Sequence, residues 1–358
     1  KMKIYIKFFT LIFLKSLLYV ISIMFSLIFI LNLLTELEFF KEIEVNASFP
    51  IFLSLLNSPS MIFEMLPFIF LITTQLFFIK LFNNNEIEIF KYSGLKNTNI
   101  LKIFSLIAIL TGIILTIIFY NFSAVFKNFY LEEKTKYTTD SKYLAVITKN
   151  GLWIKDEIDE KIYIVNSSKI ENNFLINNFI TEFNKDYEVI RNLKSDKIDI
   201  QKTDWRAYNV KVYNKNNYEL KKELNIQTNF DYKRIQTLYS NLSSLSFYQL
   251  FELRKNYKKL NYSLTEINLQ FLKIISFPLY LFLVAFFSSL IMFRVKRLHN
   301  TTFKISLGLF FSVIIYYVNN FFMVLGSTER VSLIFAVFIP LILLSIINSL
   351  MLNRINEK

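Results

Sequence analysis

The chain has 358 residues, of which 53% are apolar and 17% aromatic, and its formal net charge is +13. It has no cysteine and one histidine, His299, which excludes disulfides, thiol chemistry, histidine-rich metal sites and any Ser-His-Asp triad that does not use His299. Its five glycines form neither a phosphate-binding loop nor a dinucleotide fingerprint, so we expect that the chain does not hydrolyse ATP by itself.

Six apolar runs each have about 20 residues, the length that a helix needs to cross roughly 30 Å of hydrocarbon. They predict an α-helical integral membrane protein with spans near residues 16–34, 62–82, 100–125, 270–293, 304–325 and 331–352. The apolar segment 4–14 is interrupted by Lys7 and closed by Lys15. It is therefore predicted to be an interfacial helix before the first span.

Lysine and arginine gather before the first span, between the fourth and fifth spans, and after the sixth. Such residues favour cytoplasmic loops. The opposite loop, 35–61, is acidic and has Lys41 as its single base. This pattern predicts cytoplasmic termini, a cytoplasmic loop at 83–99 and an external insert between spans three and four.

The insert, about 127–268, is rich in Asn, Lys, Asp and Tyr. Alternating apolar and polar residues at 161–168, 197–201 and 210–227 predict short antiparallel strands, and therefore a small β domain outside the membrane. Residues 246–260 (SFYQLFELRKNYKKL) have helical spacing with a cationic end and predict a helix leading back to the fourth span.

Few polar residues within the spans suggest chemistry. Glu64 is interpreted as a carboxylate at the interface rather than part of an ion pathway. Asn319 and Asn320 lie deep in the fifth predicted span, where packing between helices and lining a substrate path are both open. His299 lies among cations in a loop and is interpreted as a solvated residue. The positive charge is explained by cytoplasmic loops and anionic lipid rather than by nucleic acid.

The polar stretch NEIEIFKYSGLKNTNI (85–100) separates two spans and predicts a short amphipathic helix. Ile87, Phe90 and Lys91 share one face of such a helix. It can lie on the membrane surface, or it can dock into a cleft of a soluble partner. Periodicity alone leaves both interpretations open.

Several motifs occur together in a known order. NEIEIFKYSGL after the second span has an acidic residue, apolar positions and then Ser93-Gly94; NGLWIKD (150–156) and IYIV (162–165) precede TDWRAYNV (203–210). Pro278 falls in the fourth span. Over essentially its whole length the chain resembles the lipopolysaccharide export permeases of the LptF/LptG family. Its ending at 316–344, with Gly326 and Pro340, is more similar to LptG. The acidic loop TELEFFKE departs from the family pattern.

The resemblance implies six transmembrane helices with an inserted periplasmic β-jellyroll domain. The implied domains are residues 1–126 (spans one to three, with a coupling helix near 85–95), 127–236 (the jellyroll-like domain), 237–268 (a helical connection) and 269–358 (spans four to six). It further implies a Gram-negative bacterial inner-membrane subunit that extracts lipopolysaccharide and passes it to a periplasmic bridge. No cofactor is expected on this chain, because a partner binds the ATP.

The resemblance also implies partners and site residues. The expected partners are a cytoplasmic LptB-like ABC ATPase, an LptF-like sister permease, and LptC-like and LptA-like bridge proteins. Contact with the ATPase is expected from Glu86, Ile87, Glu88, Phe90, Lys91 and Gly94. Lipid phosphates are expected to pair with Lys41, Lys134 or Lys136, and Asn319 and Asn320 are further candidates for the substrate path.

Other function classes stay open at this point. A MacB- or FtsX-like mechanotransmission or export permease is the nearest alternative, and it is expected to have four spans. A membrane protein whose outer β domain binds a ligand, without transport, is the second. A secondary carrier and an integral membrane enzyme are less favoured, because the two halves show no repeat and the spans have few titratable residues.

Overall fold

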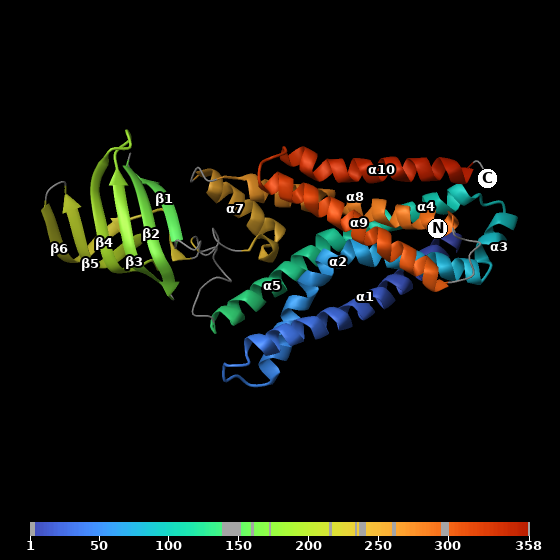
Figure 1. Cartoon of the computed structure of the whole chain (residues 1–358), viewed down its shortest axis with the longest axis horizontal. Helices are drawn as coiled ribbons and strands as arrows, with labels where there is room; N and C mark the ends of the chain where they lie inside the picture. Colours follow the sequence, from blue (N-terminus) through green and yellow to red (C-terminus); the bar gives the residue numbers. More distant parts are fainter. Residues whose placement is uncertain are drawn as a thin grey trace. The chain divides into compact units, whose positions relative to one another are not determined.

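The computed structural model describes residues 4–137, 152–158, 161–171, 173–214, 217–232, 235, 241–259, 263–294 and 301–356. The chain divides into two compact units, which Figure 1 shows in the colours of the sequence. We call Lys1–Lys127 with Thr265–Lys358 the membrane unit, and Asn128–Leu264 the β unit.

Long helices build the membrane unit. They are α1 (Ile4–Phe39), α2 (Ser48–Asn83), α4 (Asn97–Ile114), the π-helical turn η1 (Leu115–Phe119), α5 (Tyr120–Thr135, which continues into the β unit), α8 (Thr265–Arg294), α9 (Thr301–Ser327) and α10 (Leu333–Asn356). Within the described residues, six helical segments are long and apolar enough to cross a membrane. The prediction of a six-span protein with an inserted β domain is confirmed. A four-span architecture does not fit.

The first helix corrects one prediction. Residues 4–14 are not a separate interfacial helix, because α1 continues without a break to Phe39. Phe9 and Phe13 are fully buried, and both rings lie 6.0 Å from the ring of Phe77 on α2. The aromatic packing of this first part against α2 explains why it continues the span. The second helix likewise starts at Ser48, so most of the loop expected at 35–61 is helical.

Polar contacts between helices fix the arrangement of the spans. The amide of Asn32 on α1 donates to the Ser58 hydroxyl at 3.3 Å. The side-chain amide of Gln75 on α2 donates to the backbone carbonyl of Lys304 on α9 at 2.8 Å. This approach requires Gly308, since a Cβ there would lie 1.9 Å from Gln75 Nε2. In a low-dielectric environment such satisfied contacts specify which helices pack together.

The β unit contains one six-stranded antiparallel sheet with the strands in sequence order. The strands are β1 (Leu152–Ile158), β2 (Lys161–Glu171), β3 (Phe174–Phe183), β4 (Val189–Asp199), β5 (Asp204–Asn214) and β6 (Asn217–Gln227). Every run that alternation and the resemblance placed in strands overlaps one or two of these strands, while residues 150–151 and 215–216 of those runs lie outside the described residues. Among the described residues the strands form a meander, as one antiparallel sheet of the predicted inserted β domain.

The segment after β6 is bound to β1 through one carboxylate. Asp156 is buried and accepts hydrogen bonds from the Thr228 hydroxyl at 2.7 Å, the Asn229 backbone N–H at 2.9 Å and the Asn229 side-chain amide at 2.8 Å. The indole N–H of Trp205 donates to the Phe230 carbonyl at 2.7 Å. The bonds of Asp156 join residues more than 70 positions apart, and together with the bond of Trp205 they hold the segment against the buried face of the sheet.

The helix predicted at 246–260 is α7 (Phe247–Lys259). It starts with a capping box: the Ser246 backbone N–H donates to Gln249 Oε1 at 2.9 Å, and the Gln249 N–H donates to the Ser246 hydroxyl at 3.4 Å. Leu250 and Leu253 are its buried residues, at the helical spacing that the sequence showed.

Candidate functional site

The polar stretch between the second and third spans forms α3 (Glu86–Tyr92). Asn85 before it has a φ of 56°, and Gly94 after it has a φ of 87°, a conformation that favours glycine. Glu86 and Glu88 lie in the first turn and Lys91 in the last, which matches the direction of the helix dipole. The short helix that the sequence predicted in this stretch is therefore present, and it lies within the expected range 85–95.

One face of α3 packs against the membrane unit. The side chain of Ile87 is only 1% exposed, and the ring of Phe90 lies 5.9 Å from Phe8 and 4.9 Å from Phe9 of α1. Ile87 and Phe90 were predicted to touch a partner. Ile87 is buried and Phe90 is partly buried, and the ring of Phe90 fixes α3 on α1.

The opposite face of α3 is exposed. Ile89 is 59% and Tyr92 90% exposed, and Glu88 and Lys91 are also exposed. Tyr92 lies four positions after Glu88 and three after Ile89, so these three side chains form one face, which we call the α3 outer face. Ile89 and Tyr92 were not among the predicted contact residues. Helical periodicity could have identified them, because Ile89 and Tyr92 face outward when Ile87 and Phe90 face inward.

Glu86 lies at the border between these two faces and is partly buried. One carboxylate oxygen accepts from the Asn84 side-chain amide at 3.2 Å. The other oxygen has no hydrogen-bond partner within the described residues. A half-satisfied carboxylate at this position is suited to receive a cationic or N–H donor.

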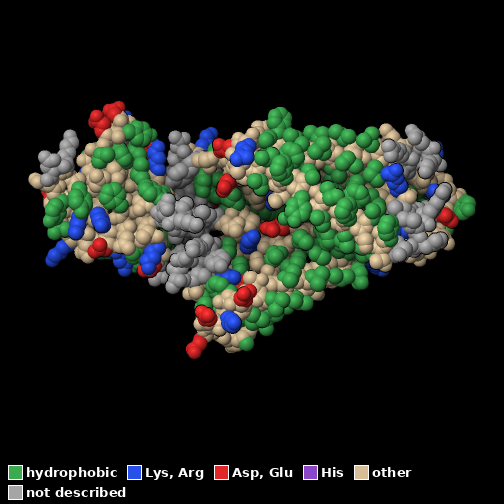
Figure 2. Space-filling model, viewed as in Figure 1, with side chains coloured by type: hydrophobic (Ala, Val, Ile, Leu, Met, Phe, Trp, Pro, Cys, Tyr) green, Lys and Arg blue, Asp and Glu red, His purple; other side chains and the backbone are tan. Residues whose placement is uncertain are grey.

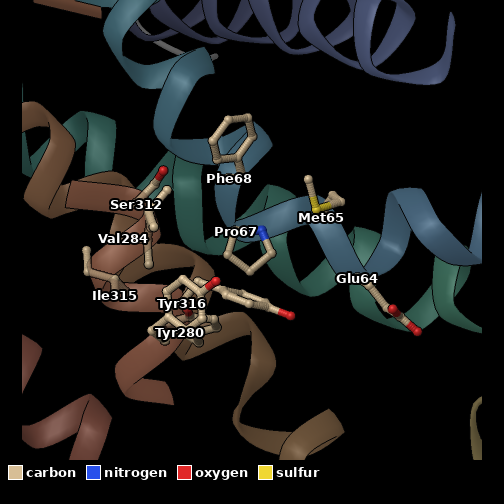
Figure 3. Close-up of a pocket in the computed structure, with 11 residues that line it drawn as sticks. Glu64, Met65, Pro67, Phe68, Tyr280, Val284, Ser312, Ile315 and Tyr316 are labelled. Atoms are coloured by element: carbon tan, nitrogen blue, oxygen red, sulfur yellow. The ribbon is translucent and has the colours of Figure 1, made fainter. Parts of the chain in front are cut away.

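A cavity of about 360 Å³ opens into the membrane unit between α2, α8 and α9. Figure 3 shows residues from these three helices around it. The lining includes Glu64 and Phe68 of α2, Tyr280 and Val284 of α8, and Ser312 and Tyr316 of α9. Its wall is mainly apolar with Glu64 as the charged residue, which is the composition of a site for an amphiphile.

The predicted phosphate-binding lysines lie outside this cavity. Lys41 is exposed in the turn after α1. Lys134 is buried and donates to the Tyr130 hydroxyl at 2.9 Å, and the exposed Lys136 pairs with Glu133 at 2.6 Å. Lys41 belongs to the membrane unit and the other two to the β unit.

Asn319 and Asn320 lie on α9, the span with the most accessible surface. Only 11% of its most apolar window is buried. Asn320 is exposed and Asn319 partly so, and neither side chain forms a hydrogen bond with the described residues. Figure 2 shows hydrophobic side chains spread over the helices of the membrane unit. The two amides therefore do not hold helices of this chain together and face outward with the apolar residues.

The β unit holds a charged cluster on its sheet. Glu182 is buried on β3 and pairs with Lys161 of β2 at 2.8 Å and with Arg191 of β4. Burial by itself raises the pKa of Glu182, but the hydrogen bonds and charges of Lys161 and Arg191 outweigh it, so the pKa lies below its ordinary value. The hydrogen bond to Glu182 raises the pKa of Lys161. This cluster joins three neighbouring strands and stabilises the sheet.

Within the part of the chain that the structure describes, no three His, Asp or Glu side chains are grouped as metal ligands. His299 lies outside the described residues.

In a comparison with protein-family models, residues 8–354 match the lipopolysaccharide export system permease LptF/LptG. The match covers the spans before the β unit, the β unit itself and the spans after it. It does not distinguish LptF from LptG. A search of curated proteins finds no match.

Proposed function

The chain belongs to the lipopolysaccharide export system permease family LptF/LptG, and from this premise we propose that it is the membrane-spanning subunit of an ABC transporter. The subunit extracts lipopolysaccharide from the bacterial inner membrane and passes it to a periplasmic bridge towards the outer membrane. The single observation that carries the proposal is the family match over residues 8–354, which includes the six apolar helices and the inserted β unit.

ATP hydrolysis is assigned to a cytoplasmic LptB-like partner that docks on the α3 outer face. The exposed Tyr92 and Ile89 supply apolar contact area, and Glu88 and Glu86 supply acceptors at its edge. The cationic loops of the sequence support a cytoplasmic position for this end and for the termini. If α3 and the termini are cytoplasmic, the insert between the third and fourth spans, and therefore the β unit, is periplasmic.

The sister permease is assigned to the accessible faces of α1 and α9. Leu18, Leu31, Tyr317 and Phe321 are among the large apolar side chains exposed there. Asn320 lies among them, and a second set of spans offers an exposed amide the hydrogen-bond partners that lipid lacks. The cavity between α2, α8 and α9 takes acyl chains of the lipid.

The β unit is assigned the contact with LptC-like and LptA-like bridge proteins. Among the described residues β1 and β6 are the edge strands of the meander, and β6 is exposed along most of its length. An unpaired edge accepts another strand through main-chain hydrogen bonds. An LptG-like rather than an LptF-like identity is part of the same proposal, since it rests on the sequence of the last two spans.

The test is purification of the chain from its host membrane, followed by identification of co-eluting proteins and lipids. We expect an ABC ATPase, a second six-span permease and bound lipopolysaccharide. In the same preparation, Glu86→Arg places a cation where the α3 border offers a carboxylate, and we expect it to remove the ATPase from the complex while membrane insertion is unchanged. Recovery of the chain without an ATPase or lipid would refute the assignment to a transporter.

A further inference from the structure

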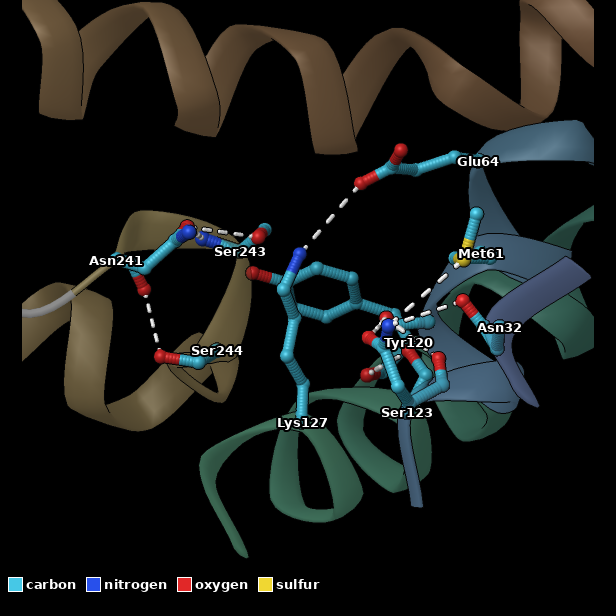
Figure 4. A network of polar contacts seen from close by, with 11 residues as sticks. Asn32, Met61, Glu64, Tyr120, Ser123, Lys127, Asn241, Ser243 and Ser244 are labelled. Carbon is cyan, nitrogen blue, oxygen red and sulfur yellow. Dashed lines mark hydrogen bonds and ion pairs between the residues drawn. The ribbon is translucent and has the colours of Figure 1, made fainter. Parts of the chain in front are cut away.

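Lys127 and Glu64 point toward one another from α5 and α2, as Figure 4 shows. The ammonium nitrogen lies 3.8 Å from Glu64 Oε1. The two partners differ in burial: the Lys127 side chain is 16% exposed and the Glu64 side chain 56%. Taking an ammonium out of water is costly unless a counter-charge compensates it. Lys127 therefore depends on an anion at this place, and Glu64 is free to turn towards solvent.

The charge at this place is not balanced. Lys273 on α8, whose side chain is partly buried, is close enough for its charge to act on Lys127. Glu64 is the one carboxylate paired with either lysine within the described residues. At 3.8 Å the contact with Glu64 is too long for a hydrogen bond, so the mostly buried ammonium of Lys127 has a counter-charge but no hydrogen-bond acceptor among the described residues. Such a site favours a further anion that offers acceptor oxygens.

The same carboxylate lines the apolar cavity. Glu64 stands at the border of the 360 Å³ space between α2, α8 and α9, and the rest of the lining is mainly apolar and aromatic. An anion held at Lys127 therefore lies next to a volume that accepts hydrocarbon. This combination matches one ligand class, an amphiphile with a phosphate group and acyl chains.

We propose that Lys127 forms a phosphate-binding site for an amphiphile whose acyl chain occupies this cavity, and that Glu64 occupies Lys127 when no phosphate is bound. A phosphate carries more charge than a carboxylate and offers more acceptor oxygens, so it displaces Glu64 from Lys127. Glu64 thus competes with the phosphate for Lys127 and lowers the affinity of the site for phosphate. The identity of the amphiphile as lipopolysaccharide rests on the proposed function, whereas the phosphate chemistry does not.

The experiment measures lipid binding to the purified complex in detergent by native mass spectrometry and by competition. The probes are lipid A carrying its phosphates, lipid A with the phosphates removed, phosphatidylglycerol and inorganic phosphate. Lys127→Gln is expected to weaken binding of phosphorylated lipid A about 10-fold and to leave the dephosphorylated form unchanged, a loss of ~1.4 kcal/mol. Glu64→Gln is expected to strengthen binding of the phosphorylated form severalfold, because the competitor is gone.

Two control variants separate a specific effect from misfolding. Lys102→Gln makes the same change at an exposed lysine of the same span, towards its opposite end, and is expected to bind as the wild type does. Lys127→Arg keeps the charge and is expected to retain binding. If the ion pair only stabilised the fold, both Lys127→Gln and Glu64→Gln would bind less lipid. The proposed competition instead predicts stronger binding by Glu64→Gln.

The probes also separate the two proposals. If inorganic phosphate competes with lipid A in the wild type and not in Lys127→Gln, the site recognises the phosphate group without the acyl chains. Lys127-dependent binding of phosphatidylglycerol without lipid A binding supports the site and overturns the proposed substrate. Equal binding of phosphorylated lipid A by the wild type and Lys127→Gln, or weaker binding by Glu64→Gln, overturns the site.

Discussion

Replacing Tyr92 by alanine tests the α3 outer face as a docking surface. A tyrosine side chain has ~150–250 Å² of surface, and 90% of it is accessible here. At ~25 cal/mol per Å², complete burial by a partner is worth at most roughly 3–6 kcal/mol. Ordering both surfaces offsets part of this gain, and truncation of a central aromatic residue in an interface commonly costs ~2 kcal/mol. We therefore expect Tyr92→Ala to weaken ATPase binding about 30-fold.

The assay is titration of the purified ATPase onto the detergent-solubilised chain, with three further variants. Tyr92→Phe keeps the ring and is expected to retain most of the affinity. Tyr248→Ala removes an equally prominent tyrosine from α7 in the β unit, where Tyr248 is 77% exposed, and is expected to have no effect. Ile89→Asp places a charge on the same face and is expected to weaken binding as well. Unchanged affinity in Tyr92→Ala and Ile89→Asp would refute docking on this face.

Three further predictions concern stability. Asp156→Ala removes three hydrogen bonds to the segment after β6 and is expected to lower the free energy of unfolding of the β unit by about 3–5 kcal/mol, measured by hydrogen exchange in the whole chain. Because the folded pKa of Glu182 lies below the unfolded value, its contribution is complete above pH ~4.3 and is lost as the pH falls through the folded pKa. Glu182→Gln is expected to flatten this acid-side slope in a pH series of unfolding curves. Gly308→Ala places a Cβ against Gln75 and is expected to cost about 1–3 kcal/mol, seen as a lower melting temperature in detergent.

The spans and strands were predictable because their signals are local. A run of apolar residues determines a membrane helix whatever its neighbours are, and alternation determines a half-buried strand. The continuation of α1 through residues 4–14 was missed because a separate interfacial helix and the first turns of a span can have the same composition. The contact of Phe9 and Phe13 with Phe77 decides between them, and that contact joins residues more than 60 positions apart.

Contacts between residues far apart in the sequence also decide the parts of the candidate site that were not predicted. Periodicity placed Ile87 and Phe90 on one face of α3 but did not say what that face meets. Phe8 and Phe9, at the start of the chain, cover it. The pair of Lys127 and Glu64 was missed for a related reason: they lie on different spans, and only the packing of α2 against its neighbours brings the two charges together.

These contacts also connect the two proposed sites. Phe90 of α3 packs on Phe9 of α1, and Phe9 packs on Phe77 of α2, where the ring centroids are 6.0 Å apart. Phe77 and Glu64 belong to the same continuous helix, separated by 13 residues or about 20 Å at 1.5 Å per residue. A displacement of α3 by a docked partner therefore acts through packed rings on a helix that also borders the lipid cavity. Because packed cores have discrete arrangements and do not deform continuously, the movement is expected to reach Glu64 as a change between two positions, with and without Lys127.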